Sequence, residues 1–271
     1  GRSMYLADYH THSTCSDDGH NTMTEMAAAA LSAGLHEICL TDHLDVVTWL
    51  GDQVREHSWR AAVEQFAAAR AALGSRIKIQ LGVELGQATE DVSRANRFLD
   101  DAPPLDFIIA SLHNLSWEYG RRDFCTVEEA DEVFARRAIG EYLDEMLALA
   151  RWGRFSVLGH LTLPLRYFNE NLGMHMTFKG FEEQVAEIFK CIIPAGRGIE
   201  LNTNRGHTPL PDEPILRLYR DLGGEIITLG SDAHTPEYVG CAITDRQALL
   251  RACGFDYFAT FDRLVPVYHK L

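Results

Sequence analysis

The chain has 271 residues, of which 46% are hydrophobic and 24% charged, a composition typical of folded globular proteins and not of disordered ones. Its 39 acidic residues outnumber the 25 basic ones, and the net charge of −14, with no basic stripe, argues against a nucleic-acid polymer as partner. No apolar run is long enough to span a membrane, so we expect no membrane partner either; the sequence leaves the oligomeric state open.

Short apolar runs alternate with longer segments of helical periodicity along the chain. The runs predict strands at residues 4–10, 37–41, 77–85, 107–112, 156–161, 198–202 and 225–230, and the segments predict helices at 23–33, 59–73, 92–99, 127–152, 178–192, 212–222 and 246–253. Such alternation predicts an α/β fold with a parallel sheet, and seven or eight units favour a barrel. No linker divides the chain, so we expect one domain over residues 4–271. The proline-rich segment 202–214 is expected to be an active-site loop.

The cysteines and the first residues bear on the cellular compartment. The six cysteines are scattered without a Cys-x-x-Cys motif, which favours reduced thiols. The first residues lack a basic region followed by an apolar stretch, so we expect no signal peptide and a cytoplasmic location. Residues 1–3, which precede Met4, are expected to be a remnant of an expression vector.

Six of the seven expected strands end in a side chain that can bind a metal ion. His10 and His12 lie two apart in the first strand, so their side chains project from the same side. The other candidates at strand ends are His43, Glu84, His113, His160, Asp232 and His234. In a barrel of parallel strands these ends form one rim, where the side chains should meet. Imidazoles and carboxylates without cysteine suit Zn, Mn or Fe, and eight ligands predict two or three divalent ions, because one ion takes three or four.

The motifs around these residues resemble those of the polymerase and histidinol phosphatase (PHP) superfamily. They are His10-Thr11-His12-Ser13, Thr41-Asp42-His43, Gly82-Val83-Glu84, Ser111-Leu112-His113, Gly159-His160-Leu161 and Ser231-Asp232-Ala233-His234. They follow the family's order from Tyr5 to His234, which is nearly the whole chain. The resemblance implies a distorted (β/α)7 barrel with parallel strands and a trinuclear metal site.

The resemblance also implies a ligand for each position. His10, His12 and Asp232 would hold the first ion, Glu84 would bridge the first and second, His113 and His160 would complete the second, and His43, His234 and an acid after His12 would hold the third. For that acid we favour Asp17, which completes a Ser-Asp pair; Asp18 and His20 are the alternatives.

Looser motifs resemble the stand-alone histidinol-phosphate phosphatases of this superfamily. Arg166-Tyr167 follows the Gly-His-Leu motif, and Glu200-Leu201-Asn202-Thr203 is followed by Arg205. The resemblance implies a metal-dependent phosphatase of histidine biosynthesis that hydrolyses L-histidinol phosphate to L-histidinol and phosphate. The chain departs from this branch at Thr162-Leu163-Pro164, which replaces an acidic stretch and leaves the substrate open.

The expected site suggests how such a hydrolysis would proceed. Divalent ions lower the pKa of bound water, so a metal-activated hydroxide would attack phosphorus. Arg205 is expected to bind the phosphate with paired hydrogen bonds, with Arg166 and Asn202 as further contacts. A metal-bound water, Asp232 or His234 would protonate the leaving group.

Three other functions compete with this interpretation. A PHP phosphoesterase could act on a nucleotide or another small phosphate ester. A non-catalytic regulatory barrel would have lost ligands, whereas every motif position is filled here. An amidohydrolase commonly needs a bridging lysine near the fourth strand, and none of the four lysines lies at the carboxyl end of an expected strand.

Overall fold

The structure, a computed structural model, describes residues 4–53 and 57–271. Parallel strands pair side by side in the order β1-β2-β4-β5-β6-β7-β8. They are β1 (Ala7–Asp8), β2 (Glu37–Leu40), β4 (Lys78–Gly86), β5 (Phe107–Ser111), β6 (Val157–Leu158), β7 (Gly198–Asn202) and β8 (Ile227–Gly230). The short β3 (His43–Asp45) extends the path of β2 and pairs with β4 in register, with His43 opposite Glu84.

Backbone hydrogen bonds between the two ends of this sheet draw it into a nearly closed barrel. The amide of Tyr9 donates to the carbonyl of Leu229 at 2.8 Å, and the amide of Asp232 donates to that of His10 at 2.8 Å. The buried carboxylate of Asp8 accepts from the amides of Ser231 at 2.9 Å and Gly240 at 2.8 Å. The predicted barrel of parallel strands is confirmed.

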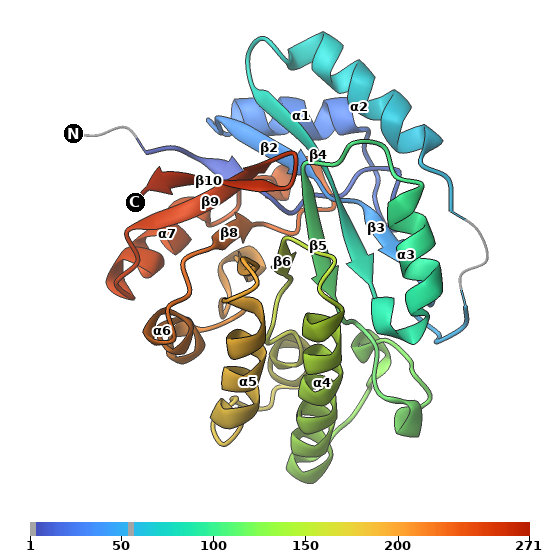
Figure 1. Ribbon diagram of the computed structural model, residues 1–271, viewed down its shortest axis with the longest axis vertical. Coiled ribbons are helices and arrows are strands. Elements are labelled where there is room, and N and C mark those ends of the chain that lie inside the picture. The colour runs from blue at the N-terminus through green and yellow to red at the C-terminus, as the bar shows by residue number, and fades with distance from the viewer. Residues whose placement is uncertain (1–3, 54–56) are drawn as a thin grey trace.

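Helices surround the strands (Figure 1). They are α1 (Met23–Ser32), α2 (Arg60–Leu73), α3 (Val92–Asp100), α4 (Glu132–Trp152), α5 (Glu182–Ile192), α6 (Glu213–Asp221) and α7 (Ile243–Ala252). Local chemistry sets their ends: Thr22 and Glu25 form a capping box at α1, and Gly153, with φ of 79°, ends α4. Among the helices in the described ranges, none has the length and apolar character to cross a bilayer.

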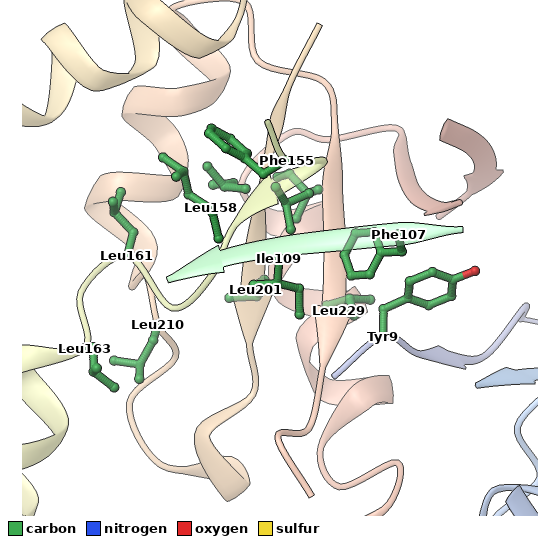
Figure 2. Packing of buried hydrophobic residues seen from close by; sticks show 14 of the residues in the cluster. Tyr9, Phe107, Ile109, Phe155, Leu158, Leu161, Leu163, Leu201, Leu210 and Leu229 are labelled. Carbon is green, nitrogen blue, oxygen red and sulfur yellow. The ribbon is translucent and has the colours of Figure 1, made fainter. Parts of the chain in front are cut away.

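Strand alternation divides the barrel into a hydrophobic core and a polar rim. In β4, Val83 faces α2 beside Ala61 and Ala62, whereas Glu84 points into the barrel. Figure 2 shows part of the core, where Tyr9, Phe107 and Ile109 lie close together, and the rings of Tyr9 and Phe107 meet edge to face at 5.0 Å. Charged groups such as Glu84 therefore lie inside the barrel near the carboxyl ends of the strands, and apolar side chains such as Val83 pack toward the helices.

A C-terminal hairpin that the sequence patterns did not predict covers the amino-terminal end. It consists of β9 (Tyr257–Asp262) and β10 (Val265–Lys270), paired antiparallel. The carbonyl of Phe261 accepts hydrogen bonds from the Tyr9 hydroxyl at 3.0 Å and from the Gln80 amide group at 2.9 Å. These contacts fix the hairpin away from the rim.

Several element bounds differ from the expected ones. Regular pairing covers only Ala7–Asp8 of the first expected strand. The expected helix 127–152 begins at Glu132, because the side chain of Asp131 accepts from the Phe134 amide and caps it there. A π-helical segment, Arg166–Asn171, was not predicted at all, and it contributes to the functional site.

Candidate metal centre

The strand ends bring imidazoles and carboxylates together in three adjoining groups. In each group the nitrogen and oxygen atoms lie within 4.8 Å of one another. The groups are His10, His12, Glu84 and Asp232; Glu84, His113 and His160; and His12, Asp18, His43 and His234. Eight of the nine positions that the sequence analysis put forward as first-choice ligands therefore lie in one cluster; the ninth, Asp17, does not belong to any of these groups.

Glu84 is the centre of the cluster. Its oxygens lie 2.8 Å from Nε2 of His10, 3.1 Å from Nε2 of His113 and 3.2 Å from Nε2 of His160. The hydroxyl of Ser111 also donates to it at 2.9 Å. Burial disfavours the charged carboxylate, but the imidazoles of His10, His43 and His113 hold the pKa of Glu84 well below its ordinary value. Glu84 is thus an ionised group shared by two of the three groups.

Asp232 joins the first strand to the last. Its Oδ1 lies 3.0 Å from Nε2 of His12 and 3.2 Å from Nε2 of His10. Burial opposes its ionisation, but His10, His12 and Arg166 keep the pKa of Asp232 well below its ordinary value. Asp232 has φ of 62°, and His160 has φ of 24°. Left-handed backbone at non-glycine residues costs energy and is concentrated at functional sites. The conformation of these two residues is therefore typical of a functional site.

The acid in the third group is Asp18, which corrects the preference for Asp17. The Asp18 carboxylate lies 3.1 Å from Nε2 of His234 and 3.5 Å from Nε2 of His43. Partial burial raises the pKa of Asp18, but the imidazoles of His234 and His43 lower it by a larger amount, so the net shift is downward. Asp17 and His20 are both exposed, and neither belongs to the three groups.

The conformation of the loop after His12 explains this difference. The side chain of Asp42 accepts hydrogen bonds from the Ser13 amide at 2.6 Å and the Ser16 hydroxyl at 2.6 Å. The amide of Gly19 in turn donates to the Ser16 carbonyl at 3.1 Å, which closes a turn over Asp17 and Asp18. Asp42, which lies far away in sequence, therefore determines which of the two neighbouring carboxylates faces the histidines.

One ring nitrogen that faces the carboxylates of the cluster makes no hydrogen bond to the described residues. It is the buried Nδ1 of His43, which lies 3.3 Å from an oxygen of Glu84. Buried polar atoms are almost always satisfied, so such an atom calls for a partner that is not part of the chain. Together with the neighbouring imidazoles and carboxylates, it fits a divalent ion of the Zn, Mn or Fe type.

Glu200 supports the cluster through His10, a role that its sequence motif did not predict. Nδ1 of His10 donates a short hydrogen bond to its carboxylate, which also accepts from the amide of His160 at 2.9 Å and from Nδ2 of Asn202 at 3.2 Å. A carboxylate on Nδ1 directs Nε2 of His10 toward Glu84 and Asp232. The signal was present in the sequence, because Glu200 and Asn202 lie two apart in one strand and so share a face.

Arg166 is the arginine that the structure brings to the cluster. Its guanidinium donates to Oδ1 of Asn204 at 2.9 Å and Oδ1 of Asn202 at 3.4 Å, and lies 3.5 Å from Asp232. It lines a cavity of about 780 Å³ that contains part of the cluster. Buried Asn202 lies behind this cavity rather than in its lining, and it links Arg166 to Glu200 and Asp232.

Arg205, the preferred phosphate contact in the sequence analysis, lies elsewhere. Its guanidinium stacks on the ring of Tyr238, 3.9 Å from the ring centre, and it is not part of the cavity lining. Its backbone has φ of 52°, in the short 3-10 turn that follows β7. The structure therefore brings Arg166, and not Arg205, into the lining of the cavity that contains part of the cluster.

Comparison with known proteins identifies the family. The family model described as PHP domain matches residues 8–204. The chain belongs to the PHP domain family. The match begins at Asp8 in the first strand and ends beyond β7, so it includes all the cluster residues except Asp232 and His234.

Two relatives that this PHP protein matches over 95% of their length are named as a histidinol-phosphatase and a probable histidinol-phosphatase. It is 28% identical over 264 residues to the histidinol-phosphatase of Lactococcus lactis, covering 95% of both chains, and 26% identical to a probable histidinol-phosphatase of Thermotoga maritima, covering 94% of this chain and 95% of that one. The crystal structure of the Lactococcus lactis histidinol phosphate phosphatase, complexed with zinc, L-histidinol and phosphate, superposes with a TM-score of 0.81 at 26% identity and covers 98% of this chain and 100% of that one.

We expect Glu84→Ala to lose more bound metal than His160→Ala. Glu84 belongs to two of the three groups, whereas His160 belongs to one, and water can replace a terminal imidazole. Zinc per chain, measured by elemental analysis after saturation and gel filtration, checks this. Equal losses in the two variants would remove Glu84 from its shared position, and at most one ion in the unsubstituted protein would contradict a multinuclear site.

We expect Glu200→Gln to weaken metal binding by roughly 10- to 100-fold, the usual effect of removing a carboxylate that orients a metal-binding histidine. The amide keeps the size of the side chain but loses the charge that fixes the His10 ring. Competition with a chromophoric chelator measures the affinity. Glu213→Gln, which removes a half-exposed carboxylate on α6, is the matched control and should bind metal like the unsubstituted protein.

Proposed function

We propose that this protein is a metal-dependent phosphomonoesterase that hydrolyses L-histidinol phosphate to L-histidinol and phosphate. The observation on which the proposal depends is the placement of three metal-competent groups and one arginine at the same rim of the barrel. The related Lactococcus lactis enzyme, crystallised with zinc, L-histidinol and phosphate over the same fold, supports the substrate.

We further propose that two or three divalent ions, of Zn, Mn or Fe, bind to this rim. His10, His12, Glu84 and Asp232 would hold one; Glu84, His113 and His160 a second; and Asp18, His43 and His234, with His12 within reach, a third. When bound, such ions supply an acidified water molecule and positive charge for the phosphoryl oxygens. Zinc in the related crystal structure supports this choice of metal.

The chain's own residues then hold the substrate and the ions in place. Arg166 offers N–H groups that can bind two phosphoryl oxygens in parallel, and Asn202 and Asn204 hold its guanidinium at the edge of the cluster. Neighbouring cations keep the pKa of both Glu84 and Asp232 low, so these carboxylates are ionised at neutral pH. We therefore assign Glu84 and Asp232 to holding ions and not to protonating the leaving alcohol.

Phosphate release from a panel of esters tests the function. The metal-reconstituted protein is assayed with L-histidinol phosphate, mononucleotides and sugar phosphates, and again after chelation. We expect the highest kcat/KM for L-histidinol phosphate and loss of activity with chelator. Preference for a nucleotide or sugar phosphate would replace the substrate but keep the phosphatase, and no release from any ester would favour a non-catalytic barrel.

We expect Arg166→Ala to lower kcat/KM by roughly 10- to 100-fold, the value of one charge-assisted contact of about 1.5–3 kcal/mol. Arg166→Lys should recover only part, because an ammonium cannot make the paired contact. Arg205→Ala is the matched control and should keep kcat/KM within about threefold of the unsubstituted enzyme, since Arg205 lies outside the cavity lining. The reverse order of the two alanine variants would return the phosphate contact to Arg205.

A further inference from the structure

The lining of the cavity at the rim includes aromatic and acidic side chains besides the metal-competent groups. Trp49 and Tyr167 belong to this lining, together with the carboxylates of Asp45, Asp52 and Asp123. These three acids are additional to the carboxylates of the three groups. With so much negative charge in its lining, the cavity favours an ester whose organic part is aromatic and cationic.

The cations of the lining do not offset this charge. Arg166 is the single arginine in the described lining, which contains no lysine, and its guanidinium is directed toward Asn202, Asn204 and Asp232. Among the described residues, Asp123 makes no ion pair, unlike Asp45, which lies 3.9 Å from Nδ1 of His43. A half-buried carboxylate that lines a cavity without a cationic partner is a natural site for a ligand's ammonium group.

Backbone contacts hold Asp123 firmly in this wall. Its amide donates to the carbonyl of Trp49 at 2.9 Å, and its Oδ1 accepts from the amide of Cys125 at 2.8 Å. The thiol of Cys125 also lies beside this carboxylate, and burial together with the charge of Asp123 raises the pKa of that thiol to about 12. Asp52, by contrast, is exposed. Asp123 is therefore a carboxylate of the lining with a fixed backbone and no cationic side chain paired with it among the described residues.

The same turn connects Asp123 to the metal centre. Asp123 pairs with Asn114, the residue after His113, and the amide of Phe124 donates to the His113 carbonyl at 2.8 Å. Tyr167 also lies near Asp123. Burial chiefly raises the pKa of the Tyr167 hydroxyl, and the nearby carboxylate of Asp123 raises it further. Asp123 thus lies between a predicted metal ligand and the segment of Arg166.

We propose that Asp123 is a specificity-determining residue whose carboxylate binds the ammonium group of an amino-alcohol phosphate. The inference rests on the proposed function and adds the group that distinguishes the amino alcohol from other leaving groups. No covalent step is involved. The contact forms when the ester binds, and it orients the organic part away from the metal-competent groups.

The test compares two substrates in matched variants at pH 7.5, where imidazole is mostly neutral and the amine is the main cation. The substrates are L-histidinol phosphate and its analogue without the amine, 3-(imidazol-4-yl)propyl phosphate. The quantity measured is the ratio of their kcat/KM values. We expect Asp123→Asn to lower this ratio by roughly 10- to 100-fold, mainly through KM for the amine-bearing ester, and Asp123→Glu to restore part of it.

Asp221→Asn is the control, because it removes one exposed carboxylate at the end of α6, outside the cavity lining, and it should change the ratio by less than about threefold. An unchanged ratio in Asp123→Asn, or equal changes in Asp123→Asn and Asp221→Asn, would overturn the assignment to Asp123. A parallel loss for both esters would make Asp123 a structural residue and would also overturn it. Failure of the unsubstituted enzyme to hydrolyse L-histidinol phosphate would instead contradict the proposed function, so the two failures are distinguishable.

Discussion

The burial of one carboxylate, Glu84, among imidazole rings is the constraint on which the rest of the rim depends. A charged carboxylate buried alone would be strongly destabilising, and it is tolerated only where cations and hydrogen-bond donors surround it. Here the rings of His10, His43, His113 and His160 all lie within 3.3 Å of its oxygens. Because these histidines come from different strand ends, satisfying Glu84 requires those ends to converge.

This requirement gives the two ends of the barrel interior different compositions. At the amino-terminal end, aromatic and aliphatic side chains fill the interior, and the β9–β10 hairpin covers it through Phe261. At the carboxyl-terminal end the interior is filled with charge, which Glu200 and Ser111 support by hydrogen bonds. The hydrophobic half supplies the free energy of folding that offsets the desolvation and backbone strain of the polar half.

The sequence predicted those features that depend on periodicity alone. Residues two apart share a face of a strand, and parallel strands end at one rim, so the convergence of His10, His12, Glu84 and His113 followed from spacing. The choice between Asp17 and Asp18 did not, because it depends on hydrogen bonds from Asp42, which lies far away in the chain. Local sequence contains no signal for such a contact.

The arginine and the hairpin illustrate two other limits. Arg166 reaches the rim from a π-helical segment, a rare backbone conformation that helical periodicity does not predict. Arg205 lies in the expected loop, but a left-handed turn directs it onto Tyr238. In the hairpin, β10 is largely exposed and contains Pro266, so it lacks the continuous apolar run that identified the buried strands.

The placement of these residues also separates the chemistry from the choice of substrate. Most candidate metal ligands lie at strand ends, where the packing of the barrel determines their positions. Asp123 lies between β5 and α4, and Arg166 and Tyr167 lie between β6 and α5, so the groups assigned to the substrate belong to connecting segments. Connecting segments tolerate sequence change better than strands do. Thr162-Leu163-Pro164, where the chain departs from the histidinol-phosphatase pattern, precedes Arg166 in one of these segments. That departure can therefore alter how the leaving alcohol is held while the cluster around Glu84 stays intact.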